Sequence, residues 1–461
     1  MSEEQQKIKD TTKNMTEGQP MRLVLGFSVP LLFGFLLQQL YNVVDMIVVG
    51  RFIGVGALAG VGVTGSINFL IIGLCIGLCS GFAIPVAQKF GAGDYVMMRR
   101  YMANGIWLSI IFAIVITIVT VALTGTILKV MKTPGDIFDY AYSYIFVIFL
   151  GIPTVFVYNL LAGIMRAIGD SKTPMKILIV STIVHIILDV VFVIVFENGT
   201  AGVAYSTVIS QLTSGTLCFV ILMKKFPILH IKKEEWQWQP SLVLTLCGMG
   251  IPMGLQYSIT AIGSVILQSA VNTLGSAAAA SIAAAVKVSI FFSSPFEALG
   301  NTMATYGGQN VGAGRLERLD EGLKATVILS VIYTFVAYTV IWIFGRQLAM
   351  LFIDQAEVHI LDDAILYLRI STAFFIPLAL VMIYRFLIQG MGFGSLAILA
   401  GVSEMIARIL GAFILVPLFG FVGAAFSAPL AWIFADAFLV PAYHYCKKKM
   451  KSISKMPRKD A

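Results

Sequence analysis

Charged residues are scarce in this chain of 461 residues: only 12% are Asp, Glu, Lys or Arg, whereas 58% are hydrophobic. A typical soluble domain carries about 25% charged residues. The shortage extends along the whole sequence, and the mean hydropathy is +0.89. The composition therefore argues against a soluble protein and indicates a chain that lies in a lipid bilayer.

Motifs that would supply chemistry or energy are also missing. The sequence has no GxxxxGK[ST] phosphate loop, no HExxH and no GxSxG motif, and its five cysteines form no CxxC pair. These absences argue against a nucleotide-driven pump and against the common hydrolases. The first twenty residues are polar, so we expect no cleaved signal peptide. We expect no enzymatic activity and no cofactor, and transport would be driven by an ion gradient or by the substrate's own gradient.

Long apolar blocks recur along the chain, and each has the length of about 20 residues that a membrane span needs. One longer polar segment, 224–240, is basic and holds Pro227 and Pro240, so it is expected to tie two groups of six spans loosely together. The twelve predicted spans cover residues 23–49, 57–83, 101–128, 140–162, 175–196, 201–223, 242–271, 276–304, 324–344, 363–387, 396–418 and 421–445.

The distribution of basic residues predicts the orientation. Alternate loops hold most of the Lys and Arg side chains, including those at 99–100, 224–225, 232–233 and 447–449. The positive-inside rule then places both termini and the linker in the cytoplasm. The net charge of +8 is thereby explained by membrane topology and not by nucleic-acid binding. We expect a multi-pass protein of the plasma membrane.

The two halves of the sequence repeat each other. AQKFGAG at 87–93 corresponds to GQNVGAG at 308–314, and GTAGVAYS at 199–206 corresponds to GFVGAAFS at 420–427. Six spans return the chain to its starting side, so the repeats are parallel. The sequence predicts an all-α integral membrane protein with twelve transmembrane helices, in two six-helix lobes related by a pseudo-two-fold axis along the membrane normal.

The predicted domains follow from these spans. Transporters of this design hold their substrate near the interface of the repeats. The domains are a cytoplasmic N-terminal tail (1–22), an N-lobe (23–223), a cytoplasmic linker (224–241), a C-lobe (242–445) and a basic cytoplasmic tail (446–461).

Strongly polar side chains are rare in the spans of the first half, and they form two stripes. Gln38, Asn42 and Asp45 share one face of the first predicted helix. His185 and Asp189 lie one helical turn apart in the fifth span. Because a charge within a span costs roughly 2.5–3.5 kcal/mol on insertion scales, these side chains need a compensating function.

Two carboxylates, an imidazole and neutral oxygens can hold a proton or a small hard cation. The candidate ion-coupling residues are Asp45, His185, Asp189, Thr207 and Asn159, with Na⁺ possible at Asp45 and Asp189. The alternative is that Asp45 pairs with a basic residue and that the others only join helices through hydrogen bonds. Apart from Lys176, at the very start of the fifth, no Lys or Arg occurs within the predicted spans of the first half, which disfavours pairing for Asp45.

The second half has a different charge pattern. Its first span repeats the stripe with neutral side chains, namely Gln256, Thr260, Ser264 and Gln268. Its charged candidates are Lys287, Glu404 and Arg408, and Glu297 is a further acid. Glu404 and Arg408 are four residues apart in the favourable order, so structural pairing is the preferred interpretation there. Ion coupling is therefore expected in the first half.

Over residues 22–445, the chain resembles the MATE (multidrug and toxic compound extrusion) family within the MOP flippase superfamily. The resemblance rests on LYNVVDMIVVGRFIG, AQKFGAGD, MRAIGDSKTP, ILD and GGQNVGAG. It implies two six-helix lobes, alternating access, and export of organic cations against Na⁺ or H⁺. It also implies an N-lobe ion site that contains Asp45, Asp189, Thr207 and Asn159.

The chain departs from the family pattern at several positions. His185 stands where the family usually has asparagine. An imidazole is a poorer sodium ligand than an amide oxygen but a better proton carrier, so coupling to H⁺ and/or Na⁺ stays open. The acidic residues that some members place in spans 7 and 10 are absent, and Lys287 stands where arginine is common.

A cavity that bears a carboxylate favours cations, and aromatic and Met side chains adapt to varied apolar shapes. The expected partners are small organic cations and membrane lipid, and we expect a monomer. The alternative is a flippase or exporter of a lipid-linked or amphipathic anion, for which Lys287, Arg385 and Arg408 would provide basic groups. The candidate substrate-binding residues are Gln38, Tyr41, Asn42, Tyr158, Met253, Gln256 and Tyr257.

Overall fold

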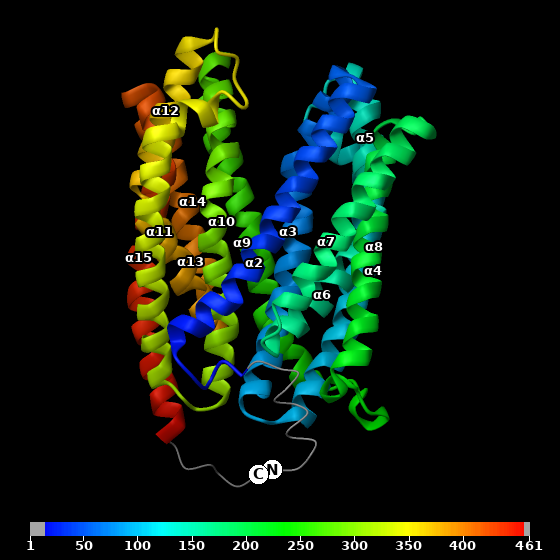
Figure 1. Ribbon diagram of the computed structural model, residues 1–461, viewed down its shortest axis with the longest axis vertical. Helices are drawn as coiled ribbons and strands as arrows, with labels where there is room; N and C mark the ends of the chain where they lie inside the picture. Colours follow the sequence, from blue (N-terminus) through cyan, green and yellow to red (C-terminus); the bar gives the residue numbers. More distant parts are fainter. Residues whose placement is uncertain (1–13, 456–461) are drawn as a thin grey trace. The chain divides into compact units, whose positions relative to one another are not determined.

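The computed structural model describes residues 14–455, so the predictions for 1–13 and 456–461 concern residues outside the described part of the chain. Within 14–455 the chain is almost entirely helical and contains no strand (Figure 1). The predicted all-α fold is therefore confirmed.

The helices of the first half follow the predicted spans. Two of them, α2 and α7, continue directly into short π-helical segments, η1 (Val49–Ile53) and η2 (Val190–Val195). The helices are α2 (Pro20–Val48), α3 (Val55–Gly91), α4 (Tyr95–Val130), α5 (Gly135–Leu150), α6 (Ile152–Ala167), α7 (Lys172–Asp189) and α8 (Gly199–Lys225).

The second half repeats this pattern after the short 3-10 turns η3 (Pro227–Leu229) and η4 (Lys233–Glu235) of the linker. A π-helical segment, η5 (Gly411–Leu415), again follows the helix that corresponds to α7. The helices are α9 (Pro240–Asn272), α10 (Ser276–Gly312), α11 (Glu317–Ala349), α12 (Val358–Ala373), α13 (Phe375–Gly390), α14 (Gly394–Leu410) and α15 (Val416–Lys455).

Two predicted spans, 140–162 and 363–387, are bent and not continuous. The axes of α5 and α6 differ by 47°, and those of α12 and α13 differ by 51°. Pro153 and Pro377 lie in the first turns after the breaks, where they lack the N–H group that would continue the preceding helix. The apolar composition identified these spans, but it did not reveal the bends.

The last two predicted spans, 396–418 and 421–445, follow each other without a loop. The helical stretch that contains both, Gly394–Ser452, has 59 residues and is much longer than a single span. Gly420, with φ 55° and ψ −130°, is non-helical and separates its two parts. Together with the other eight long helices and the two bent pairs, the described residues supply the twelve predicted spans.

The described chain forms two compact units, and each unit takes part of one helix from the other half of the sequence. Unit 1 contains Phe33–Ser258, and unit 2 contains Met15–Leu32 together with the chain from Ile259 onward. Both boundaries fall inside helices, between Leu32 and Phe33 in α2 and between Ser258 and Ile259 in α9. α2 and α9 are therefore the helices that run from one unit into the other.

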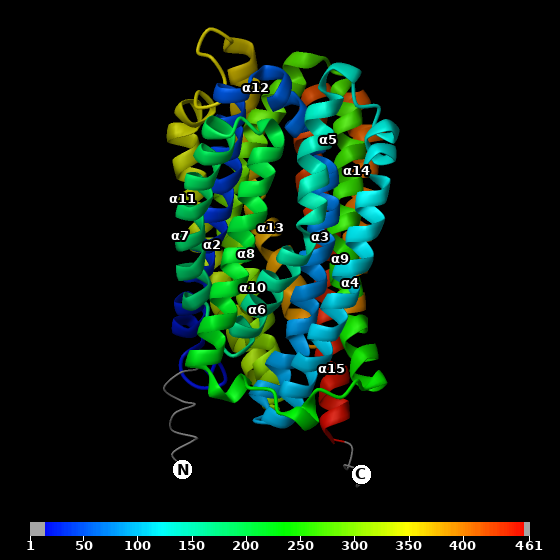
Figure 2. The same ribbon diagram turned by 90° about the vertical axis from the view of Figure 1, so that its right-hand side faces the viewer.

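Within unit 1, α3 packs against α4, α5 and α6, and α7 runs beside α8 (Figure 2). The first part of α9 also belongs to this unit and lies very close to α3. A Cβ atom at Gly81 would lie 2.4 Å from Gly250 Cα, so only glycine permits this approach. In unit 2, α10 packs against α11, α12 and α13, and α14 packs against α15.

The linker is bound to unit 1 and is not loose, so that expectation is wrong. Phe226 and Leu229 are buried, with exposed fractions of 0% and 1%. Arg99 of α4 donates two hydrogen bonds of 2.7 Å to the carboxylate of Glu235, and Asn104 donates to the carbonyl of Gln237. The hydrogen bonds from Arg99 hold the pKa of Glu235 below its usual range. Arg99 thus holds the linker in place, a role that charge counting alone did not reveal.

The segment that leads into α2 is bound in a similar way, but to unit 2. Met15 donates its backbone N–H to Gln309 and accepts from Asn310 at its carbonyl, with distances of 2.8 and 3.2 Å. Arg315 donates to the carbonyl of Thr16 at 2.6 Å, and Arg318 donates to that of Gly18 at 2.9 Å. Each of the two helices that run from one unit into the other, α2 and α9, is therefore preceded by a segment held by hydrogen bonds.

We predict that Glu235→Gln releases the linker from α4, because the amide cannot replace the bidentate carboxylate of a charged pair. Amide hydrogen exchange in residues 226–239 should become faster at neutral pH. Glu234→Gln, at an exposed neighbouring side chain, is the matched control and should leave the exchange unchanged.

The same release should occur in the unmutated protein at low pH. Because the pKa of Glu235 is lowered in the folded state, its stabilising effect is complete above about pH 4.3, the ordinary glutamate value, and is lost as the pH falls through the lowered value. Equal exchange in Glu235→Gln and the unmutated protein at pH 7 would show that the pair does not hold the linker.

Candidate functional site

Three ionisable side chains meet inside unit 1. Asp45 comes from α2, and His185 and Asp189 come from the last turns of α7. His185 Nε2 lies 3.3 Å from Asp45 Oδ1, and His185 Nδ1 lies 3.7 Å from Asp189 Oδ2. One ligand atom of each residue lies within 4.8 Å of the other two. The structure thus brings the two predicted stripes together, with the imidazole in contact with both carboxylates.

The cluster is buried, and many of its polar atoms have no hydrogen bond. The exposed fractions are 0% for Asp189, 1% for His185 and 8% for Asp45. Among the described residues, no hydrogen-bond partner exists for Asp45 Oδ1, His185 Nδ1 or either carboxylate oxygen of Asp189. Each unpaired buried polar group costs about 1–3 kcal/mol. A proton or a small cation placed among these atoms would satisfy them.

No basic side chain neutralises the two carboxylates. Within residues 14–455, the ion-pair contacts of Asp45 and Asp189 are made only with His185. Arg166 does lie in α6, beyond the predicted end of that span, but its neighbours are Tyr158, Cys79 and Cys218. Structural pairing with Lys or Arg therefore does not explain why Asp45 is buried.

The backbone beside the cluster is irregular on both helices. η2 begins at Val190, immediately after Asp189, and η1 begins at Val49, one turn after Asp45. π-helical segments place an extra residue in a turn, and they are frequent at functional sites because they redirect side chains. These local departures from the α-helix accompany the meeting of α2 and α7.

Of the other predicted ion-coupling residues, one contacts the cluster and one does not. Thr207 Oγ1 of α8 lies 3.4 Å from His185 Nε2 and donates to the carbonyl of Val203. Asn159 of α6 donates to the carbonyl of Val155 at 2.9 Å, and no hydrogen bond within the described residues joins it to Asp45, His185 or Asp189. Thr207 is therefore part of this cluster, whereas Asn159 is bound to its own helix.

The predicted substrate-binding residues lie in unit 1 at different depths. The Tyr41 ring meets the His185 ring edge to face, with the centroids 4.5 Å apart. Asn42 is exposed and Gln38 is half-buried. The remaining candidates on α6 and α9 pack mainly between helices: Tyr158, Met253 and Gln256 are buried, and Tyr257 is half-buried against Phe69. Their contact with a substrate stays a prediction.

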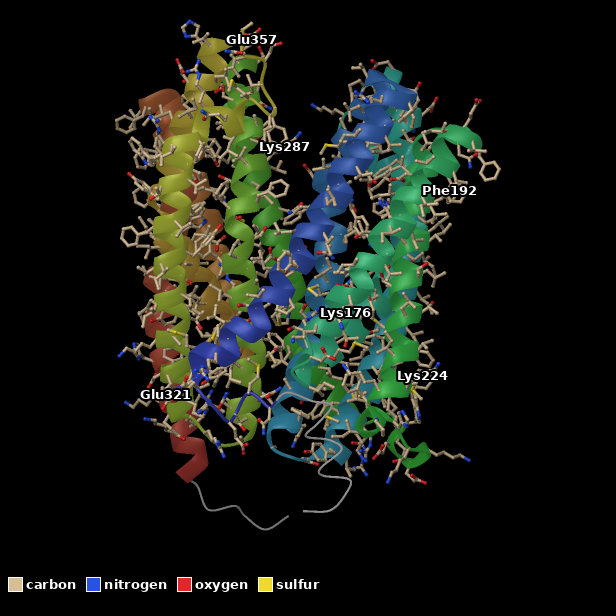
Figure 3. The ribbon with its side chains drawn as sticks, in the orientation of Figure 1. Lys176, Phe192, Lys224, Lys287, Glu321 and Glu357 are labelled. Atoms are coloured by element: carbon tan, nitrogen blue, oxygen red, sulfur yellow. The ribbon has the colours of Figure 1, made fainter. Side chains whose placement is uncertain are left out.

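A second charged cluster occupies unit 2. Glu404 of α14 accepts a close hydrogen bond from Arg385 of α13, and its other oxygen lies 3.5 Å from Arg408 Nη2. The expected bridge between Glu404 and Arg408 is thus present. Lys287, labelled in Figure 3, is exposed on α10, with its ammonium 5.6 Å from the ring centre of Phe352.

Two more residues belong to this second environment, and Asp436 was not singled out from the sequence. Arg385, named above as a basic group for an anionic substrate, lies within α13, and its side chain is 4% exposed. Asp436 lies within α15, and its Oδ1 atom is buried without a hydrogen-bond partner in the described chain. The signal was available in both cases, since each charge interrupts an apolar run.

Comparisons with known proteins agree with this architecture. The sequence profile of the MatE family matches residues 30–191 and 252–414, one block in each half of the chain. The chain is 28% identical over 366 residues to the probable multidrug resistance protein YpnP of Bacillus subtilis (strain 168), covering 79% of this chain and 81% of that protein. It is 29% identical over 338 residues to the probable multidrug resistance protein YoeA of the same strain, covering 72% and 73%.

The fold is similar to that of a multidrug resistance MATE family transporter of the MOP superfamily solved in an outward-facing conformation. The TM-score is 0.89 at 22% identity, and the match covers 97% of this chain and 100% of that one. This likeness confirms the predicted fold of twelve helices in two lobes.

We predict that Asp189→Asn stabilises the protein, because an amide removes a buried charge and can donate to a neighbouring acceptor. The gain should be about 1–3 kcal/mol, the cost of an unpaired buried polar group. The apparent melting temperature in detergent should rise by about 2 °C or more. Asp139→Asn, at an exposed aspartate of α5, is the control and should leave it unchanged. A lower melting temperature for Asp189→Asn would show that Asp189 is a structural partner.

Proposed function

Since the chain belongs to the MatE family, whose members are multidrug transporters and not enzymes, we propose that it exports small organic cations in exchange for H⁺ and/or Na⁺ by alternating access. We place it in the plasma membrane as a monomer, with both termini in the cytoplasm. No cofactor takes part, and the exchanged ion is a transported substrate.

The observation that carries this proposal is the cluster of unpaired polar atoms around His185. Four buried atoms of Asp45, His185 and Asp189 lack hydrogen bonds in the described structure, and no Lys or Arg neutralises the two carboxylates. The site is unfavourable when it is empty, because its charged groups lie within a membrane span. It is also small, since one ligand atom of each residue lies within 4.8 Å of the others. Both properties suit a proton or a small cation. A bulky organic cation does not fit among these atoms.

The organic cation and the exchanged small cation are proposed to bind at different depths in the cluster. Asp45 is 8% exposed, whereas Asp189 is fully buried, so Asp45 is the carboxylate that an organic cation would reach. Tyr41 stands one turn earlier on the same helix and offers an aromatic ring for a cation–π contact. The small cation would bind deeper, between Asp45 and Asp189. Competition for Asp45 couples the two, because a ligand shifts a conformational equilibrium only through its differential affinity for the two states.

His185 favours protons as the driving ion. Its two ring nitrogens face different carboxylates, at 3.3 and 3.7 Å, and an imidazole can accept a proton at one nitrogen while it donates from the other. A proton could therefore pass between Asp45 and Asp189 through His185 once His185 Nδ1 moves from 3.7 Å to hydrogen-bond distance of Asp189. An amide at this position could not relay a proton, but it would offer an oxygen to Na⁺.

The alternative of an anion exporter fits less well. Arg385 and Arg408 would be its main basic groups, and both bind Glu404 within unit 2. Lys287 is the remaining candidate of the three, and it is exposed. We therefore retain the organic-cation proposal.

We expect Asp45→Asn to insert and fold normally but to lose export of a fluorescent organic cation, because the amide cannot exchange one positive charge for another. Uptake into everted membrane vesicles should fall by at least about tenfold, equivalent to 1.4 kcal/mol of lost coupling. Asp139→Asn provides the matched aspartate change at an exposed position and should transport normally. Undiminished transport by Asp45→Asn would refute the assigned role.

We expect protons alone to drive export by the unmutated protein. The measurement uses proteoliposomes, first with an imposed pH gradient and no sodium, and then with a sodium gradient at uniform pH. His185→Asn should shift the preference towards sodium, since it replaces the proton relay by an amide oxygen. Export by the unmutated protein that requires sodium would contradict the proton relay and leave His185 as a helix-joining residue.

A further inference from the structure

The charged cluster of unit 2 contacts α9 close to the point at which this helix passes between the units. Arg408 Nη1 donates to the backbone carbonyl of Thr260 at 3.2 Å. Thr260 lies just after the boundary between Ser258 and Ile259. The same carbonyl accepts a hydrogen bond from Ser264 Oγ at 3.0 Å. A helical carbonyl that is shared among extra donors weakens the backbone ladder and favours bending.

A glycine of α9, Gly263, leaves space for the side chain of Arg408. Gly263 is buried, and a Cβ atom there would lie 3.2 Å from Arg408 Cδ and 3.4 Å from its Nη1. The arginine side chain therefore lies across the helix at a turn where the absent side chain of Gly263 makes room for it. The contact is made with the turn Thr260–Gly263.

Arg408 is held in this orientation by other buried charges. Glu404 contacts both Arg408 and Arg385, and the side chains of the three are between 4% and 11% exposed. Asp436 of α15 interacts electrostatically with Arg385 and Glu404. Buried ion pairs contribute little net stability because their desolvation is costly, so a network that spans α13, α14 and α15 is better explained by the orientation it fixes.

α2 and α9 differ in the residues that lie where each helix passes from one unit to the other. In α2, Pro30 lies two residues before the boundary and removes a backbone hydrogen bond there. In α9 the proline is Pro252, six residues before the boundary. At the boundary itself, α9 has the contact with Arg408 instead.

We propose that Arg408 is a positioning residue for transport, which fixes the turn Thr260–Gly263 to unit 2 and makes it the pivot at which α9 bends. This inference rests on the proposed alternating access, because only a rearrangement of the units requires a pivot in the helix that joins them. Glu404 and Arg385 hold Arg408 in its orientation, and Gly263 leaves the space that its side chain occupies.

The test measures bending within α9 itself. Spin labels at Thr245 and Ser269, two exposed positions on either side of the turn, would be about 36 Å apart in a straight helix. Cys247 is replaced by Ser, while the other four cysteines are buried. Arg408→Gln should broaden the distance distribution about twofold in full-length protein in nanodiscs. It should also lower the turnover of cation export more than the apparent affinity, since Asp45 lies in unit 1.

Two further variants decide the cause. Gly263→Leu keeps every charge, and because a Cβ atom there would already lie 3.2 Å from Arg408 Cδ, the larger side chain displaces the arginine from the carbonyl and should broaden the distribution as Arg408→Gln does. Arg346→Gln removes an exposed arginine paired with Asp362 and should change nothing. A distribution of unmutated width in Gly263→Leu or in Arg408→Gln, or equal broadening in Arg346→Gln, overturns the proposal.

The result is separable from the fate of the proposed function. If α9 responds as expected but no organic cation is exported, then the pivot stands and the proposed substrate fails. If cations are exported against a proton gradient while α9 is indifferent to Arg408, then the proposed function stands and the pivot fails.

Discussion

The burial of two carboxylates around one imidazole, without a lysine or arginine to neutralise them, is the constraint on which the rest of unit 1 depends. Asp45 and Asp189 are brought against His185 by two different helices, and four of the polar atoms stay unpaired. A stable protein would normally eliminate such a cluster, because each unpaired group costs about 1–3 kcal/mol. Its retention in the lipid-spanning part of the chain is explained if a cation regularly occupies it.

The two units have ionisable side chains on equivalent helices, but the acidic residues are paired with different kinds of partner. α7 in the first half and α14 in the second half both carry an acid with a partner four residues away, and each continues into a π-helical segment, η2 or η5. In unit 1 the partner is His185, whose charge can change. In unit 2 the partners are arginines, whose charge does not change under physiological conditions. The duplicated helix therefore carries a titratable cluster in one unit and a permanently charged ion-pair network in the other.

The buried cluster was predictable because intramembrane charge is costly in every possible geometry, so Asp45, His185 and Asp189 stood out without knowledge of the fold. The twelve spans were predictable for the same reason, from the length and apolarity of the blocks. The pairing of Arg385 with Glu404 was not predicted, because the two residues lie on different helices and only packing brings them together. The bends after Leu150 and Ala373 were missed because hydropathy does not register the prolines that follow. Sequence pattern thus identified which residues needed an explanation, while packing decided which of them met.

Anchoring at the helix entrances limits how such a chain can rearrange. The segment before α2 is bound to unit 2 through Gln309 and Asn310, and the linker before α9 is bound to unit 1 through Arg99. Both helices then continue into the other unit, so neither unit can move as a rigid body without deforming α2 and α9 or detaching an anchored segment. A helix of this length bends most easily where its backbone hydrogen bonds are already weakened. Pro30 weakens them in α2, and the crowded carbonyl of Thr260 weakens them in α9. If the units rearrange as proposed, these two boundaries are where bending costs least, and in α9 that turn is held by Arg408, whose side chain is 11% exposed.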